Sequence, residues 1–233
     1  MNICTIPARG GSKRIPLKNI KPFDNKPIIA YSIKAALKSN CFDLVIVSTD
    51  DNQIAEVAKK YGAQVPFLRP EDLSDDFTGT IPVVKHTIEW VENNISPVED
   101  VCCLYATAPF IQPKTIFQAY KKLKELKSDY CVSVTSFSSP IQRSIRISQD
   151  NEVSMFYPEN FYTRSQDLEL AYHDAGQFYW GRAEVFKQQK PLFTKNTTPY
   201  ILPRYLVQDI DTPEDWKRAE LIFQILKQDG EMC

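Results

Sequence analysis

A basic loop that follows the first apolar run of the chain carries groups that suit phosphate binding. Residues 2–6 form the apolar run, which we interpret as a buried strand. Gly10 and Gly11 then permit a sharp turn in which backbone N–H groups come close to a ligand. Because such donors combine with Arg and Lys at the end of a strand, the loop predicts a phosphate site rather than a merely solvated surface. Four cations surround the turn: Arg9, Lys13, Arg14 and Lys18.

A pair of carboxylates near the other end of the chain is the second group that could do chemistry. We predict a strand around Asp209 and Asp211, in which residues i and i+2 point to the same side. Two carboxylates directed at one point suit Mg²⁺, which prefers oxygen ligands and keeps waters or phosphate oxygens. The alternative is that Asp211 or Thr212 caps the helix that begins at Pro213.

The elements that must position these groups alternate between strand-like and helix-like stretches. This βαβαβαβ order indicates a three-layer, mostly parallel sheet of Rossmann type in a single α/β domain. Asp50 and Asp51 are expected to cap the second helix. Expected strands cover residues 2–6, 44–49, 64–67, 101–106, 130–135, 177–180 and 200–202. Expected helices cover residues 27–38, 51–60, 80–92, 113–126 and 213–226.

Residues 137–170 interrupt this alternation. Two short alternating stretches flank the turn-like Gln149-Asp150-Asn151, which predicts a β-hairpin outside the main sheet. A lone hairpin is only marginally stable in water, so its aromatic residues need a surface to pack on. A second copy of the chain is the simplest supplier, and we therefore expect a homodimer.

Composition excludes several classes of function. The 233 residues carry a formal net charge of −1, so no global basic field points to nucleic acid or to a membrane surface. None of the six cysteines forms a Cys-x-x-Cys pair, which argues against a zinc knuckle, and most lie in apolar runs. Buried reduced thiols and the lack of a long apolar stretch near the N-terminus lead us to expect a cytoplasmic protein.

The basic loop matches neither the P-loop nor the dinucleotide-binding spacing. It does resemble the opening motif of the acylneuraminate cytidylyltransferases, which make CMP-activated nine-carbon acid sugars. The resemblance extends over nearly the whole chain. The matching residues are Ile6-Pro7-Ala8-Arg9-Gly10-Gly11-Ser12-Lys13-Arg14-Ile15-Pro16-Leu17-Lys18-Asn19.

The resemblance implies a CTP site on a Rossmann-like nucleotidyltransferase fold. Arg9, Ser12 and Lys13 would hold the triphosphate, and Lys18 and Asn19 would approach the nucleotide and the reacting phosphate. Arg69 and the turn at Thr78 to Thr80 would frame the cytosine, although Thr78 or Thr80 also suits a helix cap. The full expected CTP set is Ala8, Arg9, Gly10, Gly11, Ser12, Lys13, Asn19, Arg69, Thr78 and Thr80.

On the sugar side, the chain departs from the sialic acid enzymes. Where these typically read Leu-Gln-Pro-Thr-Ser-Pro, this chain has Tyr105 and Ala106 but keeps Thr107. The Tyr-Ala-Thr-Ala-Pro-Phe form and the segment at 173–181 resemble the pseudaminic acid cytidylyltransferase branch. The resemblance implies that Arg164 contacts the sugar carboxylate, across a dimer interface. The expected sugar-binding residues are Tyr105, Thr107, Arg164, Gln177 and Tyr179.

These residues define the expected reaction. The predicted enzyme joins CTP to a nonulosonic acid, expected to be pseudaminic acid, with release of pyrophosphate and with Mg²⁺ as cofactor. The expected catalytic set is Arg9, Lys13, Lys18, Asp209 and Asp211, of which the two aspartates hold the metal. The alternatives are an N-acetylneuraminate, legionaminate or Kdo cytidylyltransferase, or a non-catalytic nucleotide-binding regulator on the same fold.

Overall fold

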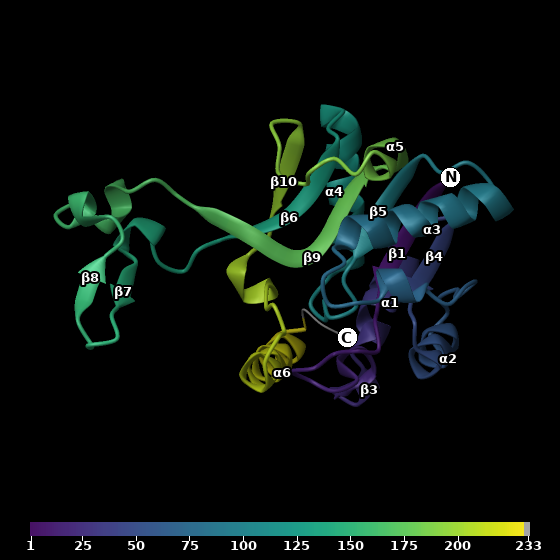
Figure 1. The fold of residues 1–233 in the computed structure, drawn as a ribbon, viewed down its shortest axis with the longest axis horizontal. Helices are drawn as coiled ribbons and strands as arrows, with labels where there is room; N and C mark the ends of the chain where they lie inside the picture. The colour runs from purple at the N-terminus through teal and green to yellow at the C-terminus, as the bar shows by residue number, and fades with distance from the viewer. Residues whose placement is uncertain (231–233) are drawn as a thin grey trace.

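A computed structural model describes residues 1–230, and its centre is a six-stranded sheet covered by helices (Figure 1). The strand order is β10-β6-β9-β5-β1-β4. The strands are β1 (Asn2–Pro7), β4 (Leu44–Ser48), β5 (Asp100–Leu104), β6 (Tyr130–Ser136), β9 (Tyr172–Arg182) and β10 (Thr197–Ile201). The helices are α1 (Ile29–Ser39), α2 (Asn52–Lys60), α3 (Thr80–Asn94), α4 (Pro113–Leu126), α5 (Ala183–Lys187) and α6 (Pro213–Gln228).

The two faces of the sheet are buried under different helices, which confirms the expected three-layer architecture. Alternate residues of a strand point to opposite faces. Accordingly Cys4 packs with α1, α2 and α4 on one face, whereas Ile3 packs with α3 and α5 on the other. Strands β1, β4 and β5 run parallel, so their carboxyl ends meet at one edge of the sheet.

The sheet differs from the prediction at β9. This strand runs antiparallel to both of its neighbours, β5 and β6, although the prediction continued the parallel alternation through residues 177–180. It spans 11 residues, bends across the sheet in Figure 1, and shifts register between Val132 and Val134 of β6. Gly176 lies in this region with a φ of +59°, a conformation that favours glycine.

Other element boundaries also differ from the prediction. Residues 64–67 do not form a strand and make only one bridge, between Gln64 and Ile46. Helix α1 begins at Ile29, because Pro27 belongs to a small hairpin of β2 (Pro22–Phe23) and β3 (Lys26–Pro27). Asp51 caps α2 by accepting hydrogen bonds from the backbone of the first turn, as predicted.

Helix α6 closes the fold next to the basic loop. Thr212 and Asp215 form a capping box around its first turn, and Pro213 occupies the first helical position. Trp216 and Phe223 pack with Phe23 of the small hairpin in an apolar cluster that is separate from the two sheet faces. This packing fixes the segment before α6, and with it Asp209 and Asp211, against the start of the chain.

The segment 137–170 leaves the body as an arm. Within it, β7 (Ile145–Ile147) pairs only with β8 (Val153–Met155), in a two-stranded sheet of its own that stands apart from the main sheet in Figure 1. Ile147 and Val153 face each other in register and are 67% and 63% exposed. The expected hairpin outside the main sheet is therefore present.

The described cysteines and helices add two observations. The five described cysteines are free, and four of them, Cys4, Cys102, Cys103 and Cys131, are buried. Cys233 lies outside the described residues. No helix within residues 1–230 is long and apolar enough to cross a membrane.

Candidate active site

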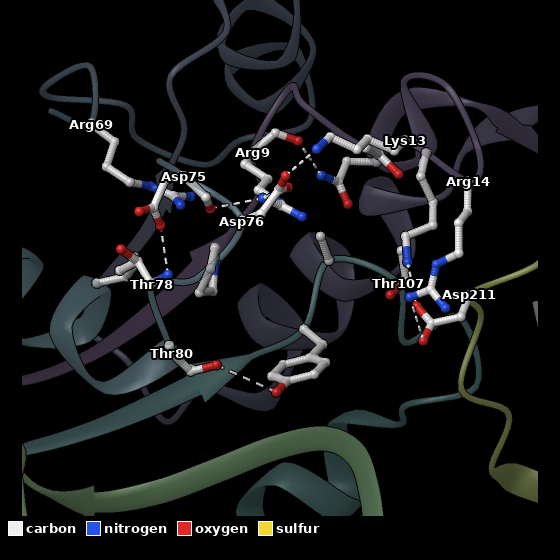
Figure 2. Close-up of a pocket in the computed structure, with 18 residues that line it drawn as sticks. Arg9, Lys13, Arg14, Arg69, Asp75, Asp76, Thr78, Thr80, Thr107 and Asp211 are labelled. Atoms are coloured by element: carbon white, nitrogen blue, oxygen red, sulfur yellow. Dashed lines mark hydrogen bonds and ion pairs between the residues drawn. The ribbon is translucent and has the colours of Figure 1, made fainter. Parts of the chain in front are cut away.

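The basic loop lines a hollow of about 580 Å³ at the carboxyl ends of the parallel strands. Its wall combines the basic loop, the 75–80 turn, the segment after β5, and Asp211. Figure 2 shows Arg69, Thr78 and Thr80 at one end, Arg14 and Asp211 at the other, and Arg9 with Asp76 between them. The hollow is therefore elongated, with a polar end, a cationic middle and an end that carries a carboxylate.

The cations of the middle section are held by an aspartate from the facing turn. Arg9 donates to Asp76 Oδ1 at 2.6 Å and to the carbonyl of Asp75 at 2.7 Å. Lys13 makes a very short contact with the other oxygen of Asp76. These hydrogen bonds lower the pKa of the Asp76 carboxyl and keep it ionised. A carboxylate therefore lies between the two cations expected to hold a triphosphate.

Gly10 has a packing role that the prediction did not include. The N–H of Gly10 donates to Asp50 at 2.8 Å, so it is already bonded within the protein. A Cβ at Gly10 would lie 2.9 Å from Asp51, which shows that the residue permits close packing on the cap of α2. The backbone of Ala8 bonds to Ser48, and Ala8 is buried. Neither Ala8 nor Gly10 nor Gly11 lines the hollow, whereas Ser12 does.

The end of the basic loop connects to Asp211. Lys18 donates to the carbonyl of Ile210 and lies 3.3 Å from Asp211 Oδ1, while Arg14 lies 2.9 Å from Asp211 Oδ2. Asn19 is 8% exposed and donates to the carbonyl of Arg9 at 2.9 Å. Asn19 therefore fixes the backbone of the basic loop, in addition to lining the hollow.

The expected cytosine residues meet at the opposite end. Arg69 is 7% exposed and donates through Nε to Ser48 Oγ at 3.1 Å, and it also bonds to the Ser48 carbonyl. Arg69 thus has a structural role at the end of β4 that its position before a proline did not reveal. Thr78 is held by its N–H to Asp75 at 2.6 Å. The cap of α3 is Gly79, so neither threonine caps that helix through its side chain.

The sugar-side residues divide into two groups. Tyr105 and Thr107 line the hollow, and the hydroxyl of Tyr105 lies 3.2 Å from that of buried Tyr179. By contrast, Gln177 is 3% exposed and donates to the carbonyl of Leu206, so its side chain supports the chain before Asp209 and does not face the hollow. Arg164 lies in the exposed arm, where it pairs with Asp167 at 2.7 Å.

The carboxylate pair is present, but not in a strand. Residues 207–211 have no regular structure, so the same-side argument for Asp209 and Asp211 was wrong in its geometry. The two side chains nevertheless line a common hollow, and burial first and the charge of Asp211 second raise the pKa of the Asp209 carboxyl. Partial desolvation by the surrounding protein is the larger cause of the raised pKa, even though Asp209 as a whole residue is exposed. Both residues line a second hollow of about 1010 Å³ that adjoins the first through Asp211.

Three site residues were missed by sequence reasoning. Arg14 was noted only as part of the charge around the loop, yet it binds Asp211 directly. Asp76 is more than 60 positions from Arg9 and Lys13, and no spacing rule connects them. Asp174 bonds to Tyr179 and is a minor cause of the raised pKa of Asp209, and its sequence signal was its place in the segment 173–181 that carries the resemblance, where no role was assigned to it.

Comparison with known proteins gives consistent results. The family model described as cytidylyltransferase matches residues 3–228. A pseudaminic acid cytidylyltransferase of Campylobacter jejuni is 45% identical over 96% of this chain and 97% of the relative. A CMP-N,N'-diacetyllegionaminic acid synthase of Legionella pneumophila is 37% identical over 96% of each chain.

Solved structures agree on the fold. The structure of a CMP:2-keto-3-deoxy-manno-octonic acid synthetase complexed with CTP superposes with a TM-score of 0.69, covering 96% of this chain and 98% of that one. The two sequences are only 16% identical, so this similarity supports the fold and not the function. The family model and the close relatives go further, and together with the hollow described above they show that this chain belongs to the cytidylyltransferase family.

Proposed function

We propose that this enzyme transfers CMP from CTP to pseudaminic acid, a nonulosonic acid, and releases pyrophosphate. The observation that carries the proposal is the layout of the hollow: a polar end, then Arg9 and Lys13, then Asp211 at the junction with the second hollow. This layout fits a base at the polar end, a triphosphate on Arg9 and Lys13, and an acid sugar that enters from the second hollow beside Asp211 and reaches the α-phosphate. The 45% identity to a pseudaminic acid cytidylyltransferase over nearly the full length supports the choice of sugar.

The chain's own residues divide the chemical work. Arg9 and Lys13 bind the triphosphate, with the planar guanidinium matching two oxygens and the ammonium acting as a point charge. The anomeric hydroxyl of the sugar attacks the α-phosphorus, and the bond from this phosphorus to the bridging oxygen of pyrophosphate breaks. One carboxylate of the Asp209 and Asp211 pair accepts the hydroxyl proton. Lys18, beside Asp211, neutralises charge that develops near the reacting phosphate.

The carboxylate pair also fits Mg²⁺. Lys18 and Arg14 pair with Asp211, whereas the side chain of Asp209 makes no hydrogen bond or ion pair within residues 1–230, where only its backbone carbonyl accepts from Gln208. Burial first, and the charge of Asp211 second, raise the pKa of the Asp209 carboxyl, and a bound cation would favour its ionised form. No group of three His, Cys, Asp or Glu side chains in the described part of the chain is placed to hold a metal ion, so phosphate oxygens and water would complete the shell. When bound, the metal supplies positive charge at the α-phosphate.

We further propose that the active form is a homodimer in the cytoplasm. The arm exposes Ile147 and Val153 on a small hairpin that pairs with no other strand within residues 1–230, and it also exposes Phe161 beyond the hairpin. A second copy covering this face would also carry its Arg164 toward a sugar site, since Arg164 lines neither hollow of its own chain. Free thiols and the use of CTP support a reducing, cytoplasmic setting.

The test is a comparison of sugars. Purified protein is incubated with CTP, Mg²⁺ and, separately, pseudaminic acid, N-acetylneuraminate, a legionaminic acid and Kdo, and pyrophosphate is measured. Fastest release with pseudaminic acid supports the proposal, and preference for another sugar replaces it by the corresponding alternative. Nucleotide binding without pyrophosphate release from any sugar would indicate a regulator rather than an enzyme.

A further inference from the structure

A chain of three hydroxyl groups links the polar end of the hollow to a single carboxylate. Thr80 Oγ1 lies 3.5 Å from the hydroxyl of Tyr105, and this hydroxyl lies 3.2 Å from that of Tyr179. The hydroxyl of Tyr179 in turn donates to Asp174 Oδ2 in a very short hydrogen bond. Thr80 and Tyr105 line the hollow, whereas Tyr179 is 3% exposed. The chain therefore runs from the ligand side into the protein.

The bend in β9 is what makes this arrangement possible. In a regular strand, Asp174 and Tyr179 would point to opposite faces and lie about 16 Å apart along the strand. The positive φ of Gly176 and the irregular pairing with β6 shorten this path. Asp174 Oδ1 accepts the N–H of Gly176 at 2.9 Å, which fixes the orientation of the carboxylate. Asp174 Oδ2 is left for Tyr179.

The direction of every hydrogen bond in the chain follows from the carboxylate. An ionised carboxylate only accepts, and a hydroxyl has one proton to donate. Because Tyr179 donates to Asp174, its oxygen accepts the proton of Tyr105. Because Tyr105 donates to Tyr179, its oxygen is left to accept from Thr80 or from a ligand. Burial raises the pKa of both tyrosines, so both phenols keep their protons.

We propose that Asp174 is a positioning residue that makes the hydroxyl of Tyr105, and that of Thr80 beside it, accept hydrogen bonds from a ligand N–H group. The inference rests on the proposed function, which offers two such groups: the exocyclic amine of cytosine and an acylamino group of the sugar. Thr80 lies at the expected cytosine end of the hollow, which favours the cytosine amine as the donor. Tyr105 and Tyr179 also line a neighbouring hollow, which could receive the acylamino group of the sugar.

The substitution Asp174→Asn reverses the chain. The Asn oxygen remains on the N–H of Gly176, so its NH₂ group faces Tyr179 and donates to it. Tyr179 then donates to Tyr105, and Tyr105 presents a proton to the ligand where it formerly presented a lone pair. A ligand N–H meets this proton unfavourably, and a carbonyl in the same place is favoured.

The experiment combines binding and kinetics. Calorimetry without sugar gives the dissociation constants of CTP and UTP, which differ in having an amine or a carbonyl at the same ring carbon. Steady-state kinetics give KM and kcat for the sugar. The variants are Asp174→Asn, Tyr105→Phe, their double variant and Tyr179→Phe. Tyr200→Phe is the matched control, because its hydroxyl bonds to Gln118 of α4, away from the hollow.

We expect Asp174→Asn to change one of the two readouts by about tenfold, the value of one hydrogen bond near 1.4 kcal/mol. A loss of preference for CTP over UTP identifies cytosine as the donor. A rise in sugar KM at constant kcat, with the nucleotide preference unchanged, identifies the sugar. The calorimetric arm needs no turnover, so its result remains readable even if the proposed reaction is wrong.

The double variant decides whether Asp174 acts through Tyr105. Asp174 also lies near Asp209, and the loss of its charge could act there instead. If the hydrogen-bonded hydroxyls transmit the effect, Asp174→Asn changes the nucleotide preference or the sugar KM by less than about twofold in the Tyr105→Phe background. An undiminished effect in that background, or no change in either readout, overturns the proposal. If Asp174→Asn does not fold, Tyr179→Phe interrupts the same series of hydrogen bonds. An unchanged preference for CTP over UTP and an unchanged sugar KM in that variant also overturn the proposal.

Discussion

Arg9 Nη1 lies 2.6 Å from Asp76 Oδ1, and the other oxygen of the same carboxylate contacts Lys13. The Asp76 carboxylate thus joins the 75–80 turn to the basic loop. We propose that a triphosphate bound by Arg9 and Lys13 takes the place of this carboxylate. On this hypothesis, nucleotide binding exchanges one anion for another and releases Asp76 from the basic loop.

Removing the charge of Asp76 should strengthen nucleotide binding. Asp76→Asn no longer competes for Arg9 and Lys13, so we expect the dissociation constants of CTP and of pyrophosphate to fall by roughly fivefold. Calorimetry at low ionic strength measures the change. Asp72→Asn on the same segment is the control, because Asp72 makes no ion pair with the basic loop. Equal effects of the two substitutions would contradict the exchange.

The carboxylate pair should be needed for turnover and not for nucleotide binding. We expect Asp209→Ala and Asp211→Ala each to abolish pyrophosphate release while CTP still binds through the basic loop. Glu214→Ala is the control, because Glu214 is an exposed carboxylate in the first turn of α6. Near-normal turnover of either aspartate variant in Mg²⁺ would show that the assignment of the metal and proton-accepting groups is wrong.

His86 should make stability depend on pH. Burial is the main cause that lowers its pKa from 6.5, and its ring packs edge-on against Phe67 at 4.7 Å. The unfolded chain binds the proton more readily, so the free energy of unfolding decreases as pH falls through about 6.5 toward the lower native pKa. We expect His86→Gln to flatten this decrease in denaturant titrations between pH 5 and 7. An unchanged slope would mean that other groups cause it.

The arm should control assembly. Ile147→Asp with Val153→Asp places two charges on the exposed face of the hairpin, and we expect a monomer by light scattering. Leu221→Asp on α6, at a site 59% exposed, is the control and should leave the dimer intact. A variant of the arm that remains dimeric, or a native protein that is monomeric and fully active, would contradict the proposed interface.

The sequence was informative where local chemistry and periodicity agree. The apolar runs predicted β1, β4, β5 and β6, and the Asp-Thr-Pro-Glu pattern predicted the cap of α6. The antiparallel direction of β9 was missed, because a buried strand has the same composition in either direction. Gln177 was assigned to the sugar from the resemblance of the segment 173–181. Nothing local shows that its amide reaches the carbonyl of Leu206, which lies 29 positions away.

In the site, too, the sequence predicted residues that lie within one loop but not their partners from distant segments. Arg9, Lys13 and Lys18 were identified because cations cluster within one loop, and the structure brings all three to the hollow. The partners of these cations, Asp76 and Asp211, come from distant segments, and only the closing of the fold places them there. Arg69 was assigned to the ligand alone, because its bonds to Ser48 depend on how the chain returns past β4.

The most direct test of the central claim is pyrophosphate release by the purified protein with CTP, pseudaminic acid and Mg²⁺. We expect one pyrophosphate for each CMP-sugar formed, dependent on all three additions and lost in Asp209→Ala. Release of pyrophosphate from CTP without the sugar, or no release with any nonulosonic acid while CTP binds normally, would contradict it.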